Sequence, residues 1–352
     1  MQTDVLIIGQ GICGTHLGYW LEKAGLSYFV VDEPVPNSAS RVAAGVINPV
    51  TGRRIVKTWM IDELMPFARD AYEQLGAELG LSLISQKNVL DFFPTPQMRR
   101  AYEQRYETDQ QYLRPVSDEQ IWRSFLQYDF GFGEIDPCYF IDLGSLLAAW
   151  RTRLRNRHRL LEEQLIYPDL VIEQNQVSYR DIRAGSIVFC DGIGSGNNPW
   201  FRNLPFAPNK GEALIIEVDG LPSTHIFKKG INMIPLGEGR FWVGSSYEWE
   251  FGDDQPSDLF RQRTESWLKD WLQLPFRVVD HVASIRPATL ERRPFVGFHP
   301  GYSSIGILNG MGTKGCSLAP FFAKQLTEQM LGKSPVLPEA DVKRFSRLLN
   351  RS

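Results

Sequence analysis

The hydrophobic positions change period twice within the first 33 residues. Residues 5–8 (VLII) form a short apolar run, typical of a strand covered on both faces in a parallel sheet. In residues 16–25 (HLGYWLEKAG) apolar side chains recur at helical spacing until Gly25 provides a stop. Residues 27–31 (SYFVV) form a second apolar run that ends at an acidic pair. The pattern predicts a strand, a helix and a second strand in immediate succession.

A glycine-rich turn, GQGICG, joins the first strand to the helix. Its GxGxxG spacing has a physical reason at each glycine: Gly9 permits a tight turn, Gly11 lets a pyrophosphate approach the backbone, and Gly14 lets the helix pack closely on the strand. The helix N-terminus, at Ile12 and Cys13, offers free N–H groups and the positive end of a dipole to phosphate. The alternative is a strand end that only turns a corner, so the context decides.

The acidic pair after the second strand supplies that context. Asp32, eighteen residues after Gly14, stands where a carboxylate accepts hydrogen bonds from a ribose 2′-hydroxyl, and Glu33 lies beside it. An acid at this position disfavours a 2′-phosphate. Because strand, glycine turn, helix, strand and acid are all present, the sequence predicts a dinucleotide-binding unit.

Hydrophobic patterns later in the chain have a different character. Residues 211–218 (GEALIIEV), 232–236 (NMIPL) and 240–249 (RFWVGSSYEW) favour antiparallel strands in a sheet with one covered face. A charged helical stretch, MRRAYEQRYE at 98–107, lies upstream of them. These patterns predict a second unit built around an antiparallel sheet.

Composition and charge exclude several classes of protein. The 352 residues have a formal net charge of −3, without the basic face that nucleic acid or an anionic membrane requires. The four cysteines lie far apart with no CxxC pair, which predicts neither a metal site nor disulfides. The sequence contains no run of about 18 apolar residues, the length needed to span a bilayer, and the first apolar run lacks the flanks of a signal peptide. We therefore expect a cytoplasmic location.

The segment after the acidic pair distinguishes between dinucleotides. Its stretch SRVAAGV, at 40–46, is built of small residues that could lie against a flat ring system. Here the sequence resembles the superfamily of FAD enzymes that includes D-amino-acid oxidase, glycine oxidase and sarcosine oxidase, in which this stretch contacts the pyrophosphate and the flavin. The resemblance assigns that role to Ser40, Arg41, Ala44, Gly45 and Val46.

Two further segments carry the resemblance. Residues 186–200 (SIVFCDGIGSGNNPW) are similar to the family's later strand and glycine turn near the adenine. Residues 303–320 are similar to its closing signature, in which a strand runs into a glycine-rich loop under the flavin and then into a helix. An ordinary strand, turn and helix is the alternative for this tail. The resemblance assigns flavin contacts in the loop to Gly310, Met311, Gly312, Thr313, Lys314 and Gly315.

The resemblance also implies a fold. We expect an α/β chain with a Rossmann-like FAD-binding domain of the glutathione-reductase type, built on a parallel sheet. A discontinuous α+β substrate domain with an antiparallel sheet accompanies it. We expect the FAD-binding domain at residues 1–80, 139–205 and 276–352, and the substrate-binding domain at 81–138 and 206–275.

Two positions depart from the sarcosine oxidases. Those enzymes attach flavin through a cysteine, whereas Cys316 falls past the closing loop, so we expect noncovalent FAD. Trp242 stands where they keep a lysine that activates oxygen, although glycine oxidases also lack that lysine. Oxygen and another electron acceptor therefore both stay open.

The resemblance implies oxidation of a C–N bond in a small amine or amino acid. A neutral amine can give its α-hydrogen as hydride to flavin N5 while its nitrogen lone pair forms an imine, which then hydrolyses in water. Such an enzyme mainly orients its substrate and excludes water. The five histidines fit this requirement, because none lies in a recognisable catalytic setting.

Three basic residues are candidates for substrate orientation. A carboxylate needs a cation, ideally a forked one, and Arg286, in ASIRPAT at 283–289, holds the position where the family's arginine before proline clamps the carboxylate. Lys314 matches a lysine that helps to hold the carboxylate in sarcosine oxidases, and Lys57 is similar in placement to an arginine that partners it. The alternatives are an exposed strand-end arginine and ordinary surface lysines.

Two other functions remain open. The sequence also resembles the oxidase domain of a bacterial enzyme that modifies the tRNA wobble uridine, whose substrate is an aminomethyl group on RNA, although the net charge makes a nucleic-acid partner unexpected. A flavin-binding protein without turnover is the other alternative. The sequence leaves open the substrate, its chirality, the electron acceptor and a possible homo-oligomer.

Overall fold

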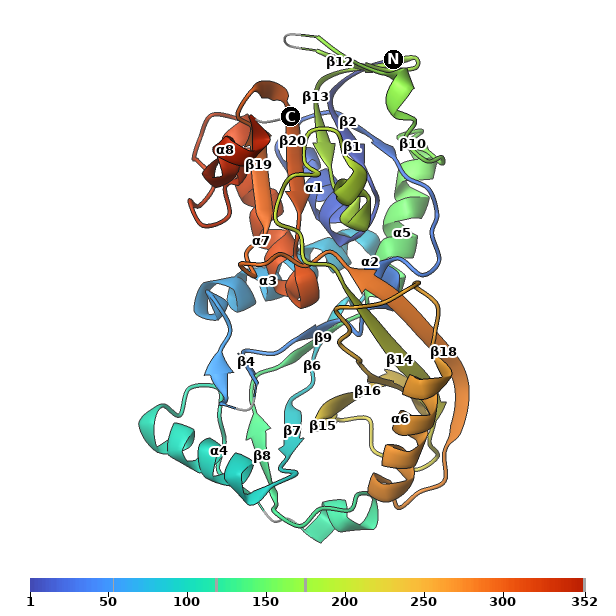
Figure 1. The fold of residues 1–352 in the computed structure, drawn as a ribbon, viewed down its shortest axis with the longest axis vertical. Helices are drawn as coiled ribbons and strands as arrows, with labels where there is room; N and C mark the ends of the chain where they lie inside the picture. Colours follow the sequence, from blue (N-terminus) through green and yellow to red (C-terminus); the bar gives the residue numbers. More distant parts are fainter. Residues whose placement is uncertain (53, 118–119, 174–175, 351–352) are drawn as a thin grey trace.

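The computed structural model describes residues 1–52, 54–117, 120–173 and 176–350. Two units, each built on one large sheet, lie one above the other, and both chain ends belong to the upper unit in the view of Figure 1. The α-helices are α1 (Ile12–Lys23), α2 (Ala39–Val42), α3 (Ile61–Leu79), α4 (Pro96–Thr108), α5 (Leu143–Asn156), α6 (Asp258–Trp271), α7 (Gly315–Met330) and α8 (Ser346–Leu349).

The sheet of the upper unit has a parallel centre. Its strands are β1 (Gln2–Ile8), β2 (Tyr28–Val31), β10 (Leu160–Leu161), β11 (Leu170–Ile172), β12 (Val177–Tyr179), β13 (Ile182–Phe189), β19 (Phe295–His299) and β20 (Tyr302–Asn309). Strands β10, β2, β1, β13 and β20 are parallel neighbours in that order. The first half of β13 pairs with β12 and its second half pairs with β20. Two different strands therefore pair with β13 along the same edge.

Both faces of β1 are covered, as its unbroken apolar run predicts. Val5 and Ile7 enter a core shared with α1, α3 and α7. Leu6 and Ile8 enter a second core, which includes Phe201 from the segment after β13. The period of two along a strand accounts for this division between the faces.

The sheet of the lower unit is mostly antiparallel. In sheet order its strands are β18 (Arg277–Arg286), β14 (Asn209–Glu217), β17 (Arg240–Gly244), β16 (Ile231–Gly237), β15 (Ile226–Lys229), β7 (Val89–Phe92) and β8 (Phe132–Ile135). Only the pairing of β15 with β7 is parallel among these described neighbours. One face packs its own core against α6, through Leu214 and Trp271. The other face, through Ala213 and Trp242, joins the core of the upper unit.

Short strands connect the two units. They are β3 (Val46–Ile47), β6 (Ile84–Gln86) and β9 (Tyr139–Ile141), which form one small sheet, and β4 (Val50–Thr51) and β5 (Val56–Lys57), which form a hairpin. Gly45 precedes β3 with φ +72°, and a Cβ there would lie 2.1 Å from the carbonyl oxygen of Ile141. A glycine is therefore required at position 45, where the chain enters strand β3 of the small three-stranded sheet.

The mixed α/β class expected from the sequence is confirmed. Two expectations about the lower unit need correction. The range 276–352, expected to belong whole to the FAD-binding domain, includes β18, which pairs with β14 in the lower sheet. The strand expected over 240–249 ends at Gly244, and only an isolated bridge between Lys210 and Glu248 continues the pairing. In the described ranges no helix has the length and hydrophobicity to cross a membrane.

Candidate cofactor and substrate site

The glycine turn brings the start of α1 into contact with the end of β1. A Cβ on Gly14 would lie 1.9 Å from the carbonyl oxygen of Gly9, which no side chain could tolerate. Gly9 itself has φ +99°, and its Cβ would lie 2.6 Å from the carbonyl oxygen of Cys190 at the end of β13. The predicted roles of these two glycines, a tight turn and close helix packing, thus have a direct steric cause.

The N-terminus of α1 faces the stretch 40–46. Gly11 is the N-cap, and the Ile12 N–H donates to Ser40 Oγ at 3.0 Å. A Cβ on Gly11 would meet the same Oγ at 2.9 Å, so the glycine keeps this approach open. Cys13 is buried, and burial raises the pKa of its thiol to about 12. The backbone donors, the helix dipole and the Ser40 hydroxyl fit a bound pyrophosphate.

Asp32 lies at the centre of a polar network beside the glycine turn. Its Oδ1 accepts the Gln10 N–H at 2.7 Å and its Oδ2 accepts Arg151 Nη1 at 2.5 Å. Arg151, from α5, is 7% exposed and also donates to Glu162 and to the Gln10 side chain. A carboxylate has about four acceptor sites, so ribose hydroxyls can still bind. Glu33, by contrast, is exposed to solvent.

The rest of the 40–46 stretch has local partners. Arg41 Nη1 donates to the Val35 carbonyl and to Ser38 Oγ, both at 3.1 Å, which ties the guanidinium to its own loop. The Val42 carbonyl accepts the Trp242 Nε1–H at 3.1 Å from β17. This bond fixes the stretch against the lower sheet and uses the polar atom of the Trp242 indole.

A buried polar cluster joins the ends of β13 and β20. Asp191 follows β13, and burial raises the pKa of its carboxyl to about 6. Its Oδ1 accepts hydrogen bonds from Ser195 Oγ and from Asn309 Nδ2, and Asn309 also donates to the Gly192 carbonyl at 2.7 Å. The cluster holds the turn after β13 beside the closing loop. No local motif predicts the cluster, because Asn309 lies more than a hundred residues after Asp191 and Ser195.

The closing loop borders the start of α1. A Cβ on Gly315 would lie 3.4 Å from the Ile12 side chain, an ordinary contact distance. Gly310 has φ +79°, and a Cβ there would lie 2.7 Å from Thr289. The Gly312 N–H donates to the Pro287 carbonyl at 3.3 Å, directly after Arg286. Within the loop Met311 is buried, whereas Thr313 is exposed. The loop therefore links the glycine turn to the end of β18.

Lys314 occupies an unusual environment for an ammonium. Burial lowers its pKa from the ordinary value to about 8, and the nearby charge of Lys228 lowers it further. Cys138 and Cys316 are the other titratable groups in its field. In the described part of the chain the structure gives Lys314 no ion-pair partner, so its positive charge is uncompensated when it is protonated.

Arg286 is held with its guanidinium over a glycine. Its Nη1 donates to Asn209 Oδ1 at 2.7 Å, and its Nη2 donates to the Ser246 carbonyl at 3.2 Å. A Cβ on Gly211 would lie 1.6 Å from Nη2, so only glycine leaves room for the group. The guanidinium also stacks on Tyr247, 5.2 Å from the ring centre. Burial lowers the pKa of Arg286 from its usual value, but an arginine stays charged.

The surroundings of Arg286 contain residues that sequence reasoning missed. Asn209 is completely buried, and its Nδ2 has no acceptor among the described residues. Asn209 and Gly211 lie on β14, paired with β18, so their relation to Arg286 depends on strand register rather than on any motif. Two of the five N–H donors of Arg286 also remain after its contacts with Asn209, Lys210 and Ser246.

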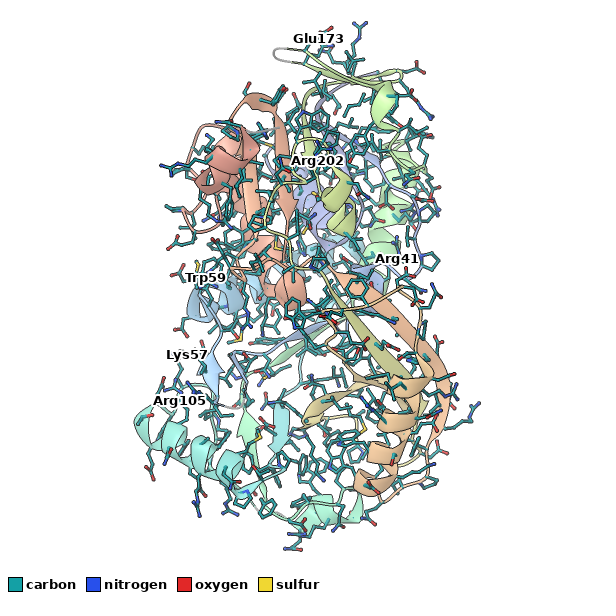
Figure 2. The ribbon with its side chains drawn as sticks, viewed as in Figure 1. Arg41, Lys57, Trp59, Arg105, Glu173 and Arg202 are labelled. Atoms are coloured by element: carbon teal, nitrogen blue, oxygen red, sulfur yellow. The ribbon has the colours of Figure 1, made fainter. Side chains whose placement is uncertain are left out.

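The structure does not bring Lys57 to these groups. Its ammonium contacts Gln111, Asp62 at 3.3 Å and Asp109 at 3.8 Å, and lies near the Tyr112 ring. In Figure 2 Lys57 projects at one side of the molecule while Arg41 lies at the other. The contacts therefore place Lys57 in a local ion-pair cluster on the hairpin.

In the described part of the chain, no hydrogen bond or ion pair joins a histidine to Asp32, Ser40, Arg286 or Lys314. His16, in α1, is completely buried beside Tyr72, and burial lowers its pKa to about 3. His281 lies 3.0 Å from Glu212 on the α6 side of the lower sheet. In the ranges that the structure describes, no group of three or more His, Cys, Asp or Glu side chains could hold a metal ion.

The glycine turn and the carboxylate of Asp32 beside it, at the end of a parallel sheet, are features typical of a dinucleotide-dependent oxidoreductase. The chain belongs to the family of FAD dependent oxidoreductases, whose family model matches residues 4–329. The resemblance inferred from the sequence is thus confirmed, and the chain is an FAD-dependent enzyme.

Two curated relatives match over nearly their whole length. The chain is similar to a glycine oxidase of Pseudomonas aeruginosa, with 24% identity over 371 residues, 99% of this chain and 100% of the relative. It is also similar to a glycine oxidase of Bacillus licheniformis, with 25% identity over 367 residues, 96% of this chain and 95% of the relative.

Two solved structures share the fold. One is the iminodiacetate oxidase from Chelativorans sp. BNC1, with a TM-score of 0.76 and 20% identity over 97% of this chain and 98% of that one. The other is the glycine oxidase from Bacillus cereus ATCC 14579, with a TM-score of 0.81 and 17% identity over 94% of this chain and 96% of that one.

The role of Asp32 in binding FAD can be tested by substituting Asp32 and, as a control, its neighbour Glu33. Asp32→Ala removes a carboxylate that the network places for the ribose, and it deprives Arg151 of its largely buried carboxylate partner. We expect the dissociation constant for FAD to rise at least about tenfold, since a hydrogen bond to a charged group contributes about 1.5–3 kcal/mol. Quenching of flavin fluorescence on titration into the apoprotein measures the constant. Glu33→Ala, one residue away and exposed, is the control, and equal effects of the two substitutions would refute the assignment.

Proposed function

We propose that the chain oxidises the C–N bond of a small amine or amino acid that carries a carboxylate, using noncovalently bound FAD. The observation that carries this proposal is the guanidinium of Arg286, which is held above Gly211 with donors to spare. A fixed, partly desolvated fork of this kind is suited to a carboxylate. The similarity to glycine oxidases, and the shared fold of an iminodiacetate oxidase, support the same substrate class.

Different residues of the chain would bind the cofactor and the substrate. The glycine turn, Ser40 and Asp32 would hold the dinucleotide, and the closing loop at 310–315 would lie beside its ring. When bound, FAD supplies an acceptor for the hydride that leaves the carbon of the C–N bond. Arg286 fixes the carboxylate and Lys314 adds a second positive charge, so the substrate is oriented through its carboxylate and reacts as the neutral amine. The imine product hydrolyses in water.

The cysteines support noncovalent attachment. All four cysteines are buried, and burial raises the pKa of each thiol. A thiol held in its neutral form is a poor nucleophile, so none is suited to forming a bond to the flavin. Denaturing the holoenzyme should therefore release all of its flavin into the supernatant.

Arg286→Met tests the proposed function directly. We expect kcat/KM for flavin reduction by amino acids to fall at least about 100-fold, because two charge-assisted hydrogen bonds to the carboxylate are lost. Anaerobic bleaching of the flavin absorbance measures the reaction. Arg292→Met, at a position that the structure leaves exposed, is the control. An Arg286→Met enzyme that amino acids reduce as fast as the wild type would refute the carboxylate assignment.

Gly211→Ala tests the same site without removing a charge. The added methyl group would occupy the place of Nη2, so the guanidinium must move. We expect the KM for amino acids to rise at least about tenfold with a smaller change in kcat, because the carboxylate is held in the wrong place. Gly252→Ala is the matched control, since no atom lies within 4 Å of its Cβ position. Stopped-flow reduction at varied substrate concentration separates KM from kcat.

Lys314 predicts a pH dependence. With its pKa lowered to about 8, Lys314 is charged below pH 8 and neutral above it. We expect the ratio of wild-type to Lys314→Met kcat/KM for a carboxylate substrate to be highest below pH 8 and to fall towards one as the pH rises through 8. Taking the ratio cancels the titration of the substrate amine. A ratio that is constant from pH 6 to pH 10 would show that Lys314 does not act through its charge.

A further inference from the structure

Every partner that the described residues give the Arg286 guanidinium is neutral. Its Nη1 donates to Asn209 Oδ1 at 2.7 Å and to the Lys210 carbonyl at 3.4 Å. Its Nη2 donates to the Ser246 carbonyl at 3.2 Å, and the Tyr247 ring lies against the group. No described carboxylate pairs with it. A partly buried cation without a counter-ion is costly, so the negative charge that balances Arg286 must come with a ligand.

The N–H groups that Arg286 has left over belong to one edge of its guanidinium. Nε donates to no acceptor among the described residues, and Nη2 has one N–H beyond the one given to Ser246. In the planar group Nε and Nη2 share an edge, and two N–H groups on one edge can bind both oxygens of a carboxylate. The neutral partners therefore hold the guanidinium and leave it able to bind an anion.

Asn209 fixes the direction in which this edge points. It lies directly opposite Arg286 in the pairing of β14 with β18, so the two side chains project from the same face of the sheet. Asn209 is completely buried. Its amide must turn Oδ1 towards Nη1, because the reverse orientation would set its own N–H donors against those of the guanidinium. The Asn209 side chain is thus a fixed acceptor for Arg286.

An aspartate would have nearly the same shape at position 209 and would lack the unpaired donor. Asn209 Nδ2 is buried and has no acceptor among the described residues, a state that native proteins rarely tolerate. An aspartate would accept the Nη1 hydrogen bond through a charged oxygen and would have no N–H to satisfy. It would also neutralise Arg286. The amide therefore orients the guanidinium and leaves its charge uncompensated.

The other face of strand β14 holds a buried carboxylate. Glu212 is completely buried, and its carboxylate accepts the Ser257 N–H at 2.6 Å and lies 3.5 Å from the Lys210 ammonium. Side chains alternate between the two faces of a strand, so Glu212 projects towards α6, on the opposite side from Arg286. Strand β14 thus places an acid near a cation on one face and a neutral amide beside the arginine on the other.

Building on the proposed function, on which this inference rests, we propose that Asn209 is a positioning residue for the substrate carboxylate. It orients the Arg286 guanidinium and, because it is neutral, leaves the full positive charge of that group to the substrate. An acid at position 209 would make Arg286 part of an internal ion pair. The enzyme would then lose its preference for amines that carry a carboxylate.

The test compares amino acids with their carboxamides, which have nearly the same shape and no negative charge. Anaerobic flavin reduction is measured with glycine, sarcosine and both enantiomers of alanine and proline, each beside its carboxamide. For the pair that reduces the wild type fastest, we expect kcat/KM for the acid to exceed that for the amide at least about tenfold, since charge-assisted hydrogen bonds are roughly twice as strong as neutral ones. This acid-to-amide ratio is then compared between variants, so the different basicities of the two amines cancel.

Two substitutions separate the charge of residue 209 from its hydrogen bond. Asn209→Leu removes the bond to Nη1 and leaves Arg286 charged, so we expect kcat/KM for the acid to fall at least about threefold while the acid stays the better substrate of the pair. Asn209→Asp keeps a bond and neutralises Arg286, so we expect the acid-to-amide ratio to fall to about one, mainly through a higher KM for the acid. A merely structural role would not make the polar substitution the one that abolishes the preference.

Asn198→Asp is the matched control. Asn198 is as completely buried as Asn209, and its Nδ2 likewise has no acceptor among the described residues. Its Oδ1 accepts the backbone N–H groups of Trp200 and Phe201 and not a guanidinium. The Asn198→Asp enzyme, reconstituted with FAD, should keep the wild-type acid-to-amide ratio.

The outcomes separate this inference from the function beneath it. A flavin that no amine reduces, or a wild type that oxidises acids no better than their amides, overturns the proposed function and this inference with it. An Asn209→Asp enzyme that keeps the wild-type ratio, or that lowers it no more than Asn209→Leu does, overturns the inference and leaves the function standing. If Asn209→Asp does not fold, Asn209→Gln and Asn209→Glu, which differ from each other in charge and not in shape, decide the question by the same ratio.

Discussion

Helix α1 can begin against the end of strand β1 only because residue 14 has no side chain. The 1.9 Å that a Cβ would leave to the Gly9 carbonyl oxygen sets the position of the helix start. Everything on the cofactor side is built around that point: Ser40 accepts the first helical N–H, Asp32 accepts the N–H of the turn, and the closing loop packs on Ile12. A single steric constraint thus fixes where a dinucleotide phosphate could lie.

The upper unit offers mainly backbone groups to the cofactor, whereas the lower unit offers side chains to the substrate. The sheet of the lower unit shares one face with the upper core, and that face carries Arg286 and Asn209 while the opposite face is sealed by α6. The Trp242 to Val42 hydrogen bond and the Gly312 to Pro287 hydrogen bond attach the sheet to the cofactor side at two points. These two hydrogen bonds therefore hold the groups proposed to bind the substrate in a fixed position relative to the glycine turn.

Local patterns were enough to predict the elements that are encoded locally. The first strand, α1, β2 and the strand and helix around the closing loop follow from periodicity and from turns. Arg286 is a candidate because the short stretch around it resembles a motif of the family. Asn209 and Gly211 could not be found in this way. Each depends on which distant strands become neighbours and in which register, a property of the sheet rather than of any stretch of sequence. The misplaced boundary at β18 has the same cause, since a strand that belongs to one sheet by pairing lies beside the other in the chain.

The parallel pairing of β7 with β15 also has a consequence for biosynthesis. Residues 89–92 leave the ribosome long before residues 226–229, so during that interval the edge of β7 that pairs with β15 has no partner from this chain. At about 5–20 residues per second that edge waits on the order of ten seconds. The unpaired amides of a nascent strand invite intermolecular pairing. Asp91, midway along β7, places a carboxylate on that waiting strand and opposes stacking against a second copy before Lys228 arrives to neutralise it.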